Sequence, residues 1–343
     1  MKIDHVHFYV EDAKVWRDWF VNYLGFTSVA SDIHSFHTYT EAVKSGVVKF
    51  LLSSPLLPTS PVAEFLRQHP PGVADIAFAV ADVEAAIAHA EMHGAIVLQS
   101  IEERQLGDFR QKCSKIAAWG GLTHTVIESL PETHPTPPHQ IITAIDHIVL
   151  NVAAGELEHV VSWYEKIFDF QPRQSFKIQT DRSALYSQVM VSRQGGVQLP
   201  VNEPASKNSQ IQEFLDFNRG PGIQHIALQT VNLIDAIAKF RQRGLSLLSV
   251  PQTYYSNLQN RSGLPLSTVE LTAIAQQEIL VDWQQDSDQG VLLQIFTQPI
   301  FGQPTFFFEF IERRCQAQGF GEGNFRALFE AIESEQIKRG TLH

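Results

Sequence analysis

The sequence predicts an α+β protein built from repeated βαβββ modules, in two domains that each curve a mixed sheet around a cavity. Two observations lead to this prediction. One is a strand-and-helix pattern that recurs along the chain, and the other is a proline-rich stretch that divides it. The length of 343 residues agrees with two domains, because single hydrophobic cores rarely grow beyond roughly 250–300 residues.

The first recurring pattern is a strand followed by an aromatic-rich helix. Residues 3–10 (IDHVHFYV) match residues 145–152 (IDHIVLNV), and both runs have the composition of strands. A helical spacing of large apolar side chains follows each run. These side chains are Trp16, Trp19, Phe20 and Tyr23 after the first, and Val160, Trp163, Tyr164 and Ile167 after the second.

A second recurring pattern lies later in each half. Residues 72–78 (GVADIAF) match residues 222–228 (GIQHIAL), and helical segments follow them at 83–93 and 233–243. A glycine ends each of these helices, as helices commonly do. The unit of strand, helix and further strands therefore occurs about four times, twice per domain, and such self-similarity is a strong organisational signal.

A proline-rich linker is predicted between the halves at residues 131–140. Proline is excluded from helix interiors and central strands, so this stretch predicts neither. The prolines are Pro131, Pro135, Pro137 and Pro138. We therefore expect an N-terminal domain at 1–130 and a C-terminal domain at 141–343 that ends in a lid helix.

Composition excludes several classes of partner. The net charge of −11, with no basic cluster, argues against nucleic acid and anionic membranes. Cys113 and Cys315 are too few for a disulfide framework or a cysteine-ligated metal. No apolar run reaches the roughly 18–20 residues of a membrane span, and no signal peptide is expected. We expect a cytoplasmic protein and leave a homo-oligomer open.

Three residues of the C-terminal half have the chemistry of a metal site. His147 and His225 lie in the matched strands, and Glu309 is the one carboxylate in an apolar strand at 306–311. A buried ionised carboxylate needs a cation nearby or takes a raised pKa. Two histidines and one carboxylate are the ligand set of the iron(II) facial triad, although zinc, manganese or cobalt also suit them.

The two halves differ at these positions. The N-terminal half keeps His5 but has Asp75 where His225 stands and Thr125 where Glu309 stands. We therefore expect a single metal site, in the C-terminal half.

The repeated modules resemble the vicinal-oxygen-chelate, or glyoxalase-like, superfamily over nearly the whole chain. The C-terminal half is similar to the 4-hydroxyphenylpyruvate dioxygenase family. Five blocks carry this resemblance: 199–204 (LPVNEP), 222–228, 288–297 (DQGVLLQIFT), 304–311 (PTFFFEFI) and 319–325 (GFGEGNF). The resemblance implies an Fe(II) enzyme that converts 4-hydroxyphenylpyruvate and O2 into homogentisate and CO2, as in tyrosine catabolism.

The resemblance also implies roles for individual residues. His147, His225 and Glu309 would hold the iron, and Gln294, Asn202 and Gln210 would take part in catalysis. Residues matching the family's substrate pocket are Ser187, Asn202, Gln210, Gln294, Phe296, Phe320 and Phe325. Gln224 matches as well, but strand alternation should turn it away from the face that carries His225.

Three alternatives remain open. Hydroxymandelate synthases use the same substrate and ligand set but oxidise the benzylic carbon, and this sequence keeps dioxygenase-like residues at Pro200, Asn202 and Phe296. Extradiol dioxygenases share the fold and ligand types but lack the block at 202–204 and the C-terminal tail that includes the block at 319–325. A non-catalytic aromatic-binding protein would have no reason to keep one complete ligand set.

Overall fold

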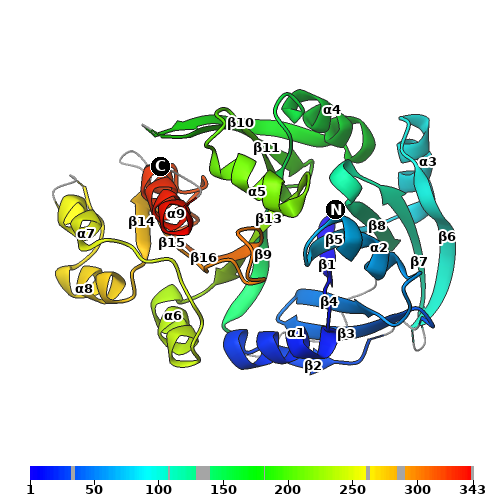
Figure 1. Ribbon diagram of the computed structural model, residues 1–343, viewed down its shortest axis with the longest axis horizontal. Coiled ribbons are helices and arrows are strands. Elements are labelled where there is room, and N and C mark those ends of the chain that lie inside the picture. Colours follow the sequence, from blue (N-terminus) through cyan, green and yellow to red (C-terminus); the bar gives the residue numbers. More distant parts are fainter. Residues whose placement is uncertain are drawn as a thin grey trace.

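The computed structural model describes residues 1–31, 35–106, 109–128, 140–180, 182–259, 263–283 and 290–340. This part of the chain forms two eight-stranded sheets, one in each half, with the N-terminal half on the right of Figure 1. The predicted linker apart from Gln140, and the first two residues of the 288–297 block, lie outside the described residues.

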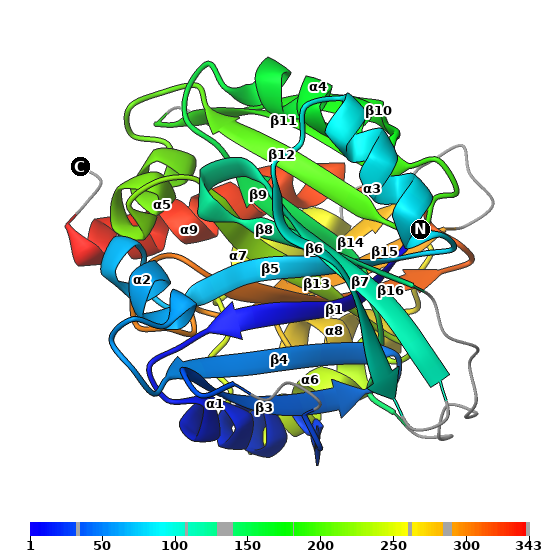
Figure 2. The same cartoon turned by 90° about the vertical axis from the view of Figure 1, so that its right-hand side faces the viewer.

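Both sheets have the same strand order. The first is β2-β3-β4-β1-β5-β8-β7-β6, and Figure 2 shows its central strands side by side. Its bounds are β1 Lys2–Tyr9, β2 Thr27–Val29, β3 Thr38–Ser45, β4 Val48–Pro55, β5 Gly72–Val80, β6 Val97–Leu106, β7 Phe109–Ala117 and β8 Thr123–Glu128. The second is β10-β11-β12-β9-β13-β16-β15-β14. Its bounds are β9 Ile142–Asn151, β10 Phe170–Gln179, β11 Ala184–Ser192, β12 Gln198–Pro204, β13 Gly222–Thr230, β14 Leu280–Trp283, β15 Val291–Phe296 and β16 Phe307–Arg314.

Helices connect and flank the strands. Their bounds are α1 Ala13–Trp19, α2 Pro61–Gln68, α3 Val83–Met92, α4 Leu157–Phe168, α5 Gln210–Asn218, α6 Leu233–Gln242, α7 Gln252–Gln259, α8 Thr268–Gln276 and α9 Phe325–Arg339. A π-helical turn, Phe20–Leu24, extends α1, and 3₁₀ turns lie at Trp119–Gly121 and Glu322–Asn324. The C-terminal α9, red in Figure 1, lies within the C-terminal half, where it contacts α5 and β10.

The repeated βαβββ architecture predicted from the sequence is confirmed. The matched runs form β1 and β9, each antiparallel to the strand of the second matched pair, β5 or β13. The expected helices are α3 and α6, and Gly94 and Gly244 follow them with φ of 89° and 86°. Those left-handed values explain the glycines, because other residues adopt them at a cost.

An aromatic cluster joins the two halves along β16. The ring of Phe308 lies 5.8 Å from that of Phe20 and 5.9 Å from that of Phe50, both in the N-terminal half. Phe8 of β1 packs edge-on against Phe306 at 5.2 Å. The main hydrophobic core therefore contains residues of both halves.

A second aromatic cluster joins β5 and β8 to α4. His124 of β8 is fully buried, with Nε2 2.9 Å from the Tyr164 hydroxyl and Nδ1 3.1 Å from the Ile76 carbonyl oxygen. The rings of Phe78, His124 and Phe168 all contact one another. Burial lowers the pKa of His124 to about 4, against a smaller opposing effect of its bond to Ile76 and of Asp75.

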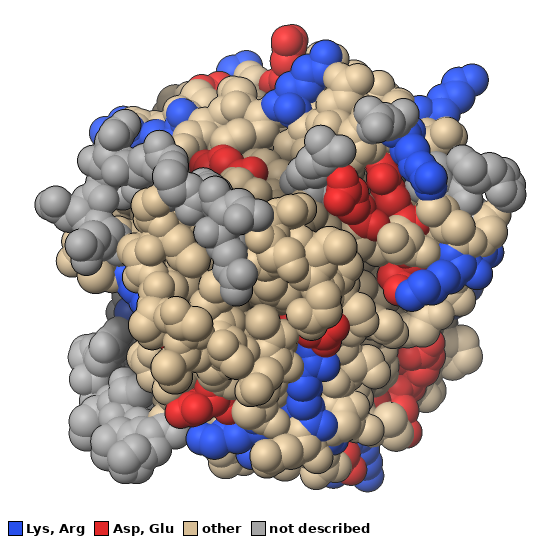
Figure 3. All heavy atoms as spheres, turned by 90° about the vertical axis from the view of Figure 1, so that its left-hand side faces the viewer, with Lys and Arg blue, Asp and Glu red and all other residues tan. Residues whose placement is uncertain are grey.

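Charged side chains are dispersed on the face of the molecule that lies on the left in Figure 1 and faces the viewer in Figure 3. Figure 3 shows Asp and Glu beside Lys and Arg in small groups around a broad area with neither. Among the described residues, no helix combines the length and apolar character that crossing a bilayer requires.

We expect Phe308→Ala to lower the free energy of unfolding by about 3–5 kcal/mol, because a fully buried ring is lost at the junction of the halves. Denaturant titration measures this loss. Phe310→Ala is the control, since Phe310 is equally buried but packs on Phe240 of the same half at 4.8 Å. Hydrogen exchange should show loss of protection in both halves for Phe308→Ala. Protection that stays intact in the N-terminal half would contradict a shared core.

We expect stability to depend on pH through His124. Between its ordinary pKa of 6.5 and its folded value of about 4, the unfolded chain binds a proton that the folded chain excludes. Stability should therefore fall as pH falls through this window, by up to about 3 kcal/mol relative to His124→Gln. Unfolding free energies measured from pH 7 to pH 4 test this, with the exposed His159→Gln as control. Parallel curves for wild type and His124→Gln would refute it.

Candidate metal centre

Three neighbouring strands bring the predicted ligands together. Ala227 of β13 stands opposite His147 of β9 on one side and opposite Glu309 of β16 on the other. The register therefore places His147 and Glu309 at the same level of the sheet, on either side of Ala227. His225 lies two residues earlier on β13 and on the same face. The three candidate ligand atoms lie within 4.8 Å of one another, and all three residues are buried.

The Glu309 carboxylate is the electrostatic centre of this group. Its Oε2 lies 3.3 Å from His147 Nε2 and 3.6 Å from His225 Nε2. Burial by itself would raise the pKa of Glu309, but the two imidazoles lower it to about 2. Burial would likewise lower the pKa of His147, and Glu309 with Asp146 raises it to about 9. These shifts favour an ionised Glu309 beside a protonated His147. A divalent cation bound here would displace the proton of His147.

A residue directly before each histidine holds its other ring nitrogen. His147 Nδ1 donates to Asp146 Oδ1 at 2.8 Å, and His225 Nδ1 donates to Gln224 Oε1 at 3.3 Å. Both Nε2 atoms are thereby left facing Glu309. Partners of this kind orient metal-binding imidazoles, so the donor set fits a metal ion with two nitrogens and one carboxylate.

The position of Gln224 corrects the sequence-based expectation. Gln224 lines the same pocket as His225, whereas strict alternation would put it on the opposite face. The pairing of β13 with β9 shifts between Ile223 and His225, so alternation breaks at Gln224. A second shift, between Ala227 and Leu228, sets Asp146 out of register beside His147.

Gln294 connects the carboxylate to the C-terminal tail. Its Nε2 donates to Glu309 Oε1 at 2.8 Å and to the Phe320 carbonyl oxygen at 3.1 Å. Its Oε1 accepts from Asn324 Nδ2 at 3.0 Å. A Cβ at Gly321 would lie 1.8 Å from Gln294 Oε1, so only glycine allows the tail to approach this closely.

A pocket of about 710 Å³, measured out to its open mouth, is lined by the three candidate ligands. Each predicted substrate residue lines it: Ser187, Asn202, Gln210, Gln294, Phe296, Phe320 and Phe325. Phe307, Leu328, Phe329 and Ile332 add apolar wall, the last three from α9. The tail therefore forms one side of the pocket.

One residue of the pocket wall, Gln210, has a buried hydrogen-bond acceptor. Among the described residues, no hydrogen-bond donor reaches Gln210 Oε1. Asn202 also lines the pocket, and it donates to Asn151 Oδ1 at 3.4 Å. Buried polar atoms are nearly always paired, so the open acceptor indicates a place for a hydroxyl group of a ligand.

The matching place in the N-terminal half contains an ion pair. His5 stands opposite Ala77 as His147 stands opposite Ala227, and Asp75 takes the place of His225. Lys115 occupies the position of Phe296, and its Nζ lies 3.6 Å from Asp75 Oδ1. Although burial opposes it, Lys115 with Thr123 lowers the pKa of Asp75. An ammonium group thus supplies positive charge in this half.

Two features of the centre were not predicted from the sequence. Asp146 and Arg313 had no assigned role, although Arg313 donates to both carboxylate oxygens of Asp146. The signal that could have found Asp146 is the Asp-His pair, which occurs at both matched strands. Arg313 carried no comparable signal.

Both halves match models of the glyoxalase/bleomycin resistance protein/dioxygenase superfamily, at residues 4–110 and 144–260. The chain is 38% identical to 4-hydroxyphenylpyruvate dioxygenase of Caenorhabditis briggsae, over 99% of this chain and 93% of the relative. It is also 38% identical to the enzyme of the same name from Coccidioides posadasii, over 99% and 94%.

A solved structure with the same architecture is that of a mutant 4-hydroxymandelate synthase from Streptomyces coelicolor. It is 26% identical, with a TM-score of 0.85 and 98% of each chain covered. The repeated sheets, the histidine–histidine–glutamate group and the full-length relatives agree with one another. The chain belongs to the 4-hydroxyphenylpyruvate dioxygenase family of this superfamily.

Proposed function

We propose that the chain is an iron(II)-dependent dioxygenase that converts 4-hydroxyphenylpyruvate and O2 into homogentisate and CO2. The observation that carries this proposal is the layout of the pocket. A histidine–histidine–glutamate group lies in the same cavity as a buried amide oxygen without a donor. A substrate with a 2-oxo acid at one end and a phenol at the other matches both.

His147, His225 and Glu309 would hold the metal. When bound, iron(II) supplies a chelating centre for the 2-oxo acid and the redox chemistry by which O2 reacts. Gln294 holds Glu309 Oε1, which leaves Oε2 directed at the two imidazoles. The donor set also suits other divalent metals, so the choice of iron rests on the proposed reaction with O2.

The remaining pocket residues would bind and orient the substrate. Gln210 Oε1 would accept a hydrogen bond from the phenol hydroxyl, and Ser187 and Asn202, which are paired across β11 and β12, line the same pocket. Phe296 and Phe325 would pack against the two faces of the substrate's aromatic ring. The apolar residues of α9 would exclude water from the reaction, as closed active sites do.

Hydroxymandelate formation is the second candidate, favoured by the similarity to the Streptomyces structure. Both reactions decarboxylate the same oxo acid, and they differ in the carbon that is oxygenated. Phe296 would set this choice by holding the ring tilted toward the metal, which favours attack at the ring carbon that bears the side chain.

We further propose the domain limits 1–130 and 141–343, with the metal confined to the second. The ion pair in the N-terminal half supports this, because the Lys115 ammonium group already neutralises the Asp75 carboxylate there. The cytoplasmic location and a homo-oligomer remain expectations from the sequence.

Glu309→Ala, His147→Ala and His225→Ala should each abolish turnover and weaken Fe(II) binding, because each removes one of only three protein ligands. Metal analysis of purified protein after dialysis against limiting iron measures the binding. Asp75→Ala is the control and should retain one iron per chain. Two irons per chain, or loss of iron from Asp75→Ala equal to that from Glu309→Ala, would refute a single C-terminal site.

The wild-type enzyme should form homogentisate as the main product. Phe296→Ile should lower its yield on the order of tenfold and divert substrate to hydroxymandelate or to uncoupled hydroxyphenylacetate, because the ring loses an aromatic wall. Chromatography of the products tests this. Phe310→Ile, on the opposite face of β16, is the control. Hydroxymandelate as the dominant wild-type product would overturn the assignment and leave the metal centre standing.

A further inference from the structure

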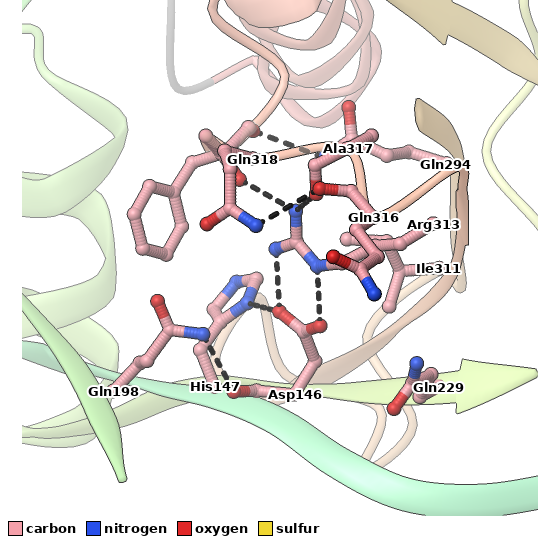
Figure 4. A network of polar contacts seen from close by, with 12 residues as sticks. Asp146, His147, Gln198, Gln229, Gln294, Ile311, Arg313, Gln316, Ala317 and Gln318 are labelled. Atoms are coloured by element: carbon pink, nitrogen blue, oxygen red, sulfur yellow. Dashed lines mark hydrogen bonds and ion pairs between the residues drawn. The ribbon is translucent and has the colours of Figure 1, made fainter. Parts of the chain in front are cut away.

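Arg313 lies on β16, four residues beyond Glu309, and divides its donors between two partners. Its Nε and Nη2 donate to the two carboxylate oxygens of Asp146, at 2.7 and 2.8 Å. Its Nη1 donates to the carbonyl oxygens of Ala317 and Gly319, at 3.1 and 2.8 Å. Figure 4 shows the guanidinium between Asp146 and the tail. The bonds to Asp146 alone would make an ordinary ion pair, so the further bonds to the tail are the feature to explain.

The first partner leads to the metal centre. Asp146 Oδ1 accepts from His147 Nδ1 at 2.8 Å, so the same oxygen is shared by Arg313 and the ligand (Figure 4). The side chain of Asp146 is 5% exposed and that of Arg313 is 14% exposed, so water competes little for these bonds. A rigid guanidinium with two parallel bonds fixes the carboxylate plane, and this plane sets the direction of the His147 ring.

The second partner leads to the tail. The chain turns away from β16 through Cys315 and Gln316, which have φ of 49° and 55°. Left-handed conformations cost free energy outside glycine, and they persist where surrounding contacts hold them. The bonds from Arg313 to Ala317 and Gly319 are such contacts. They hold the segment that leads into the 3₁₀ turn and α9.

A separate contact brings the same tail segment to the other side of the centre. The Phe320 ring packs edge-on against His147, with centroids 5.2 Å apart. The Phe320 carbonyl oxygen accepts from Gln294, which also holds Glu309. The start of the tail is thus bonded to Glu309 through Gln294, and to His147 through Arg313 and Asp146.

We propose that Arg313 is a positioning residue that links the seating of the C-terminal tail to the orientation of His147. This inference rests on the proposed metal centre and deepens it. With the tail seated, Arg313 holds Asp146 and thereby directs His147 Nε2 toward the metal. With the tail displaced, Arg313 loses two acceptors and is held by Asp146 alone, so the guanidinium no longer fixes the carboxylate that orients His147. Because binding linkage is reciprocal, metal should tighten the tail by the same free energy by which the seated tail tightens the metal.

The test compares Arg313→Gln and Arg313→Lys with Arg314→Gln in the full-length protein. Arg314 is the matched control, since it follows directly in the chain and pairs with Glu312 and Glu270 instead. Two readouts are independent of turnover. The affinity for Co(II) and its visible absorption report the ligand geometry, and hydrogen exchange of residues 315–339 with and without Co(II) reports the tail.

We expect Arg313→Gln to weaken Co(II) binding roughly 10–100-fold, the range typical of lost partners of metal ligands, and to change the visible spectrum. Metal should slow exchange in the tail of wild type and Arg314→Gln but not in Arg313→Gln. Arg313→Lys keeps the charge yet makes no bidentate bond, so it should retain part of the affinity and lose the effect on the tail.

Equal behaviour of the Arg313 and Arg314 variants in affinity and tail exchange would overturn the inference. If Arg313→Gln fails to fold, as judged by circular dichroism, Arg313→Lys decides the outcome by itself. A wild-type enzyme that binds Co(II) but makes no homogentisate would refute the proposed reaction, while the comparison of the variants would still test the linkage.

Discussion

The need to neutralise one buried carboxylate organises the C-terminal half. Glu309 is the one charged residue in the apolar first part of β16, residues 307–311, and it is nearly inaccessible to water. An anion in such a place requires positive charge and hydrogen bonds. Two imidazoles from adjacent strands and the amide of Gln294 meet this need, and they converge because β9, β13 and β16 are neighbours in the sheet. The same three strands each contribute residues to the pocket wall, so the groups that neutralise Glu309 also face the cavity.

The N-terminal half meets the same constraint in another way. Its sheet has the same strand order, and Asp75 lies where the other half has His225. Lys115 neutralises this carboxylate, and Thr123 donates a hydrogen bond to it. The polar positions that match the substrate pocket also bond to one another, since Ser53 contacts both His7 and Thr40 at 2.6 Å. This half thus pairs the Asp75 carboxylate with an ammonium group of its own, and its aromatic surface packs on β16 and α4.

The C-terminal tail forms one side of the pocket, and its hydrogen bonds lead through Gln294 and Arg313 toward two of the candidate ligands. Gln294 links Phe320 and Asn324 to Glu309, and Arg313 links Ala317 and Gly319 to Asp146. These contacts explain why glycines recur at the start of the tail. Gly319 and Gly321 have φ of 87° and 77°, and a Cβ at Gly321 would clash with Gln294. The position of the tail and the orientation of the candidate ligands thus belong to one connected hydrogen-bond network.

The sequence by itself determined the repeated architecture and the identity of the three candidate ligands. Recurrence of whole segments survives local irregularity, and a lone carboxylate in an apolar run stands out whatever its neighbours are. Alternation failed where the strands are irregular, because a shift of one residue in pairing reverses the face of a side chain. Such shifts gave Gln224 its place on the pocket and Asp146 its place beside His147. The roles of Arg313 and Lys115 were decided only by tertiary structure, because each pairs with a carboxylate that is remote in sequence, and no local pattern records such a distance.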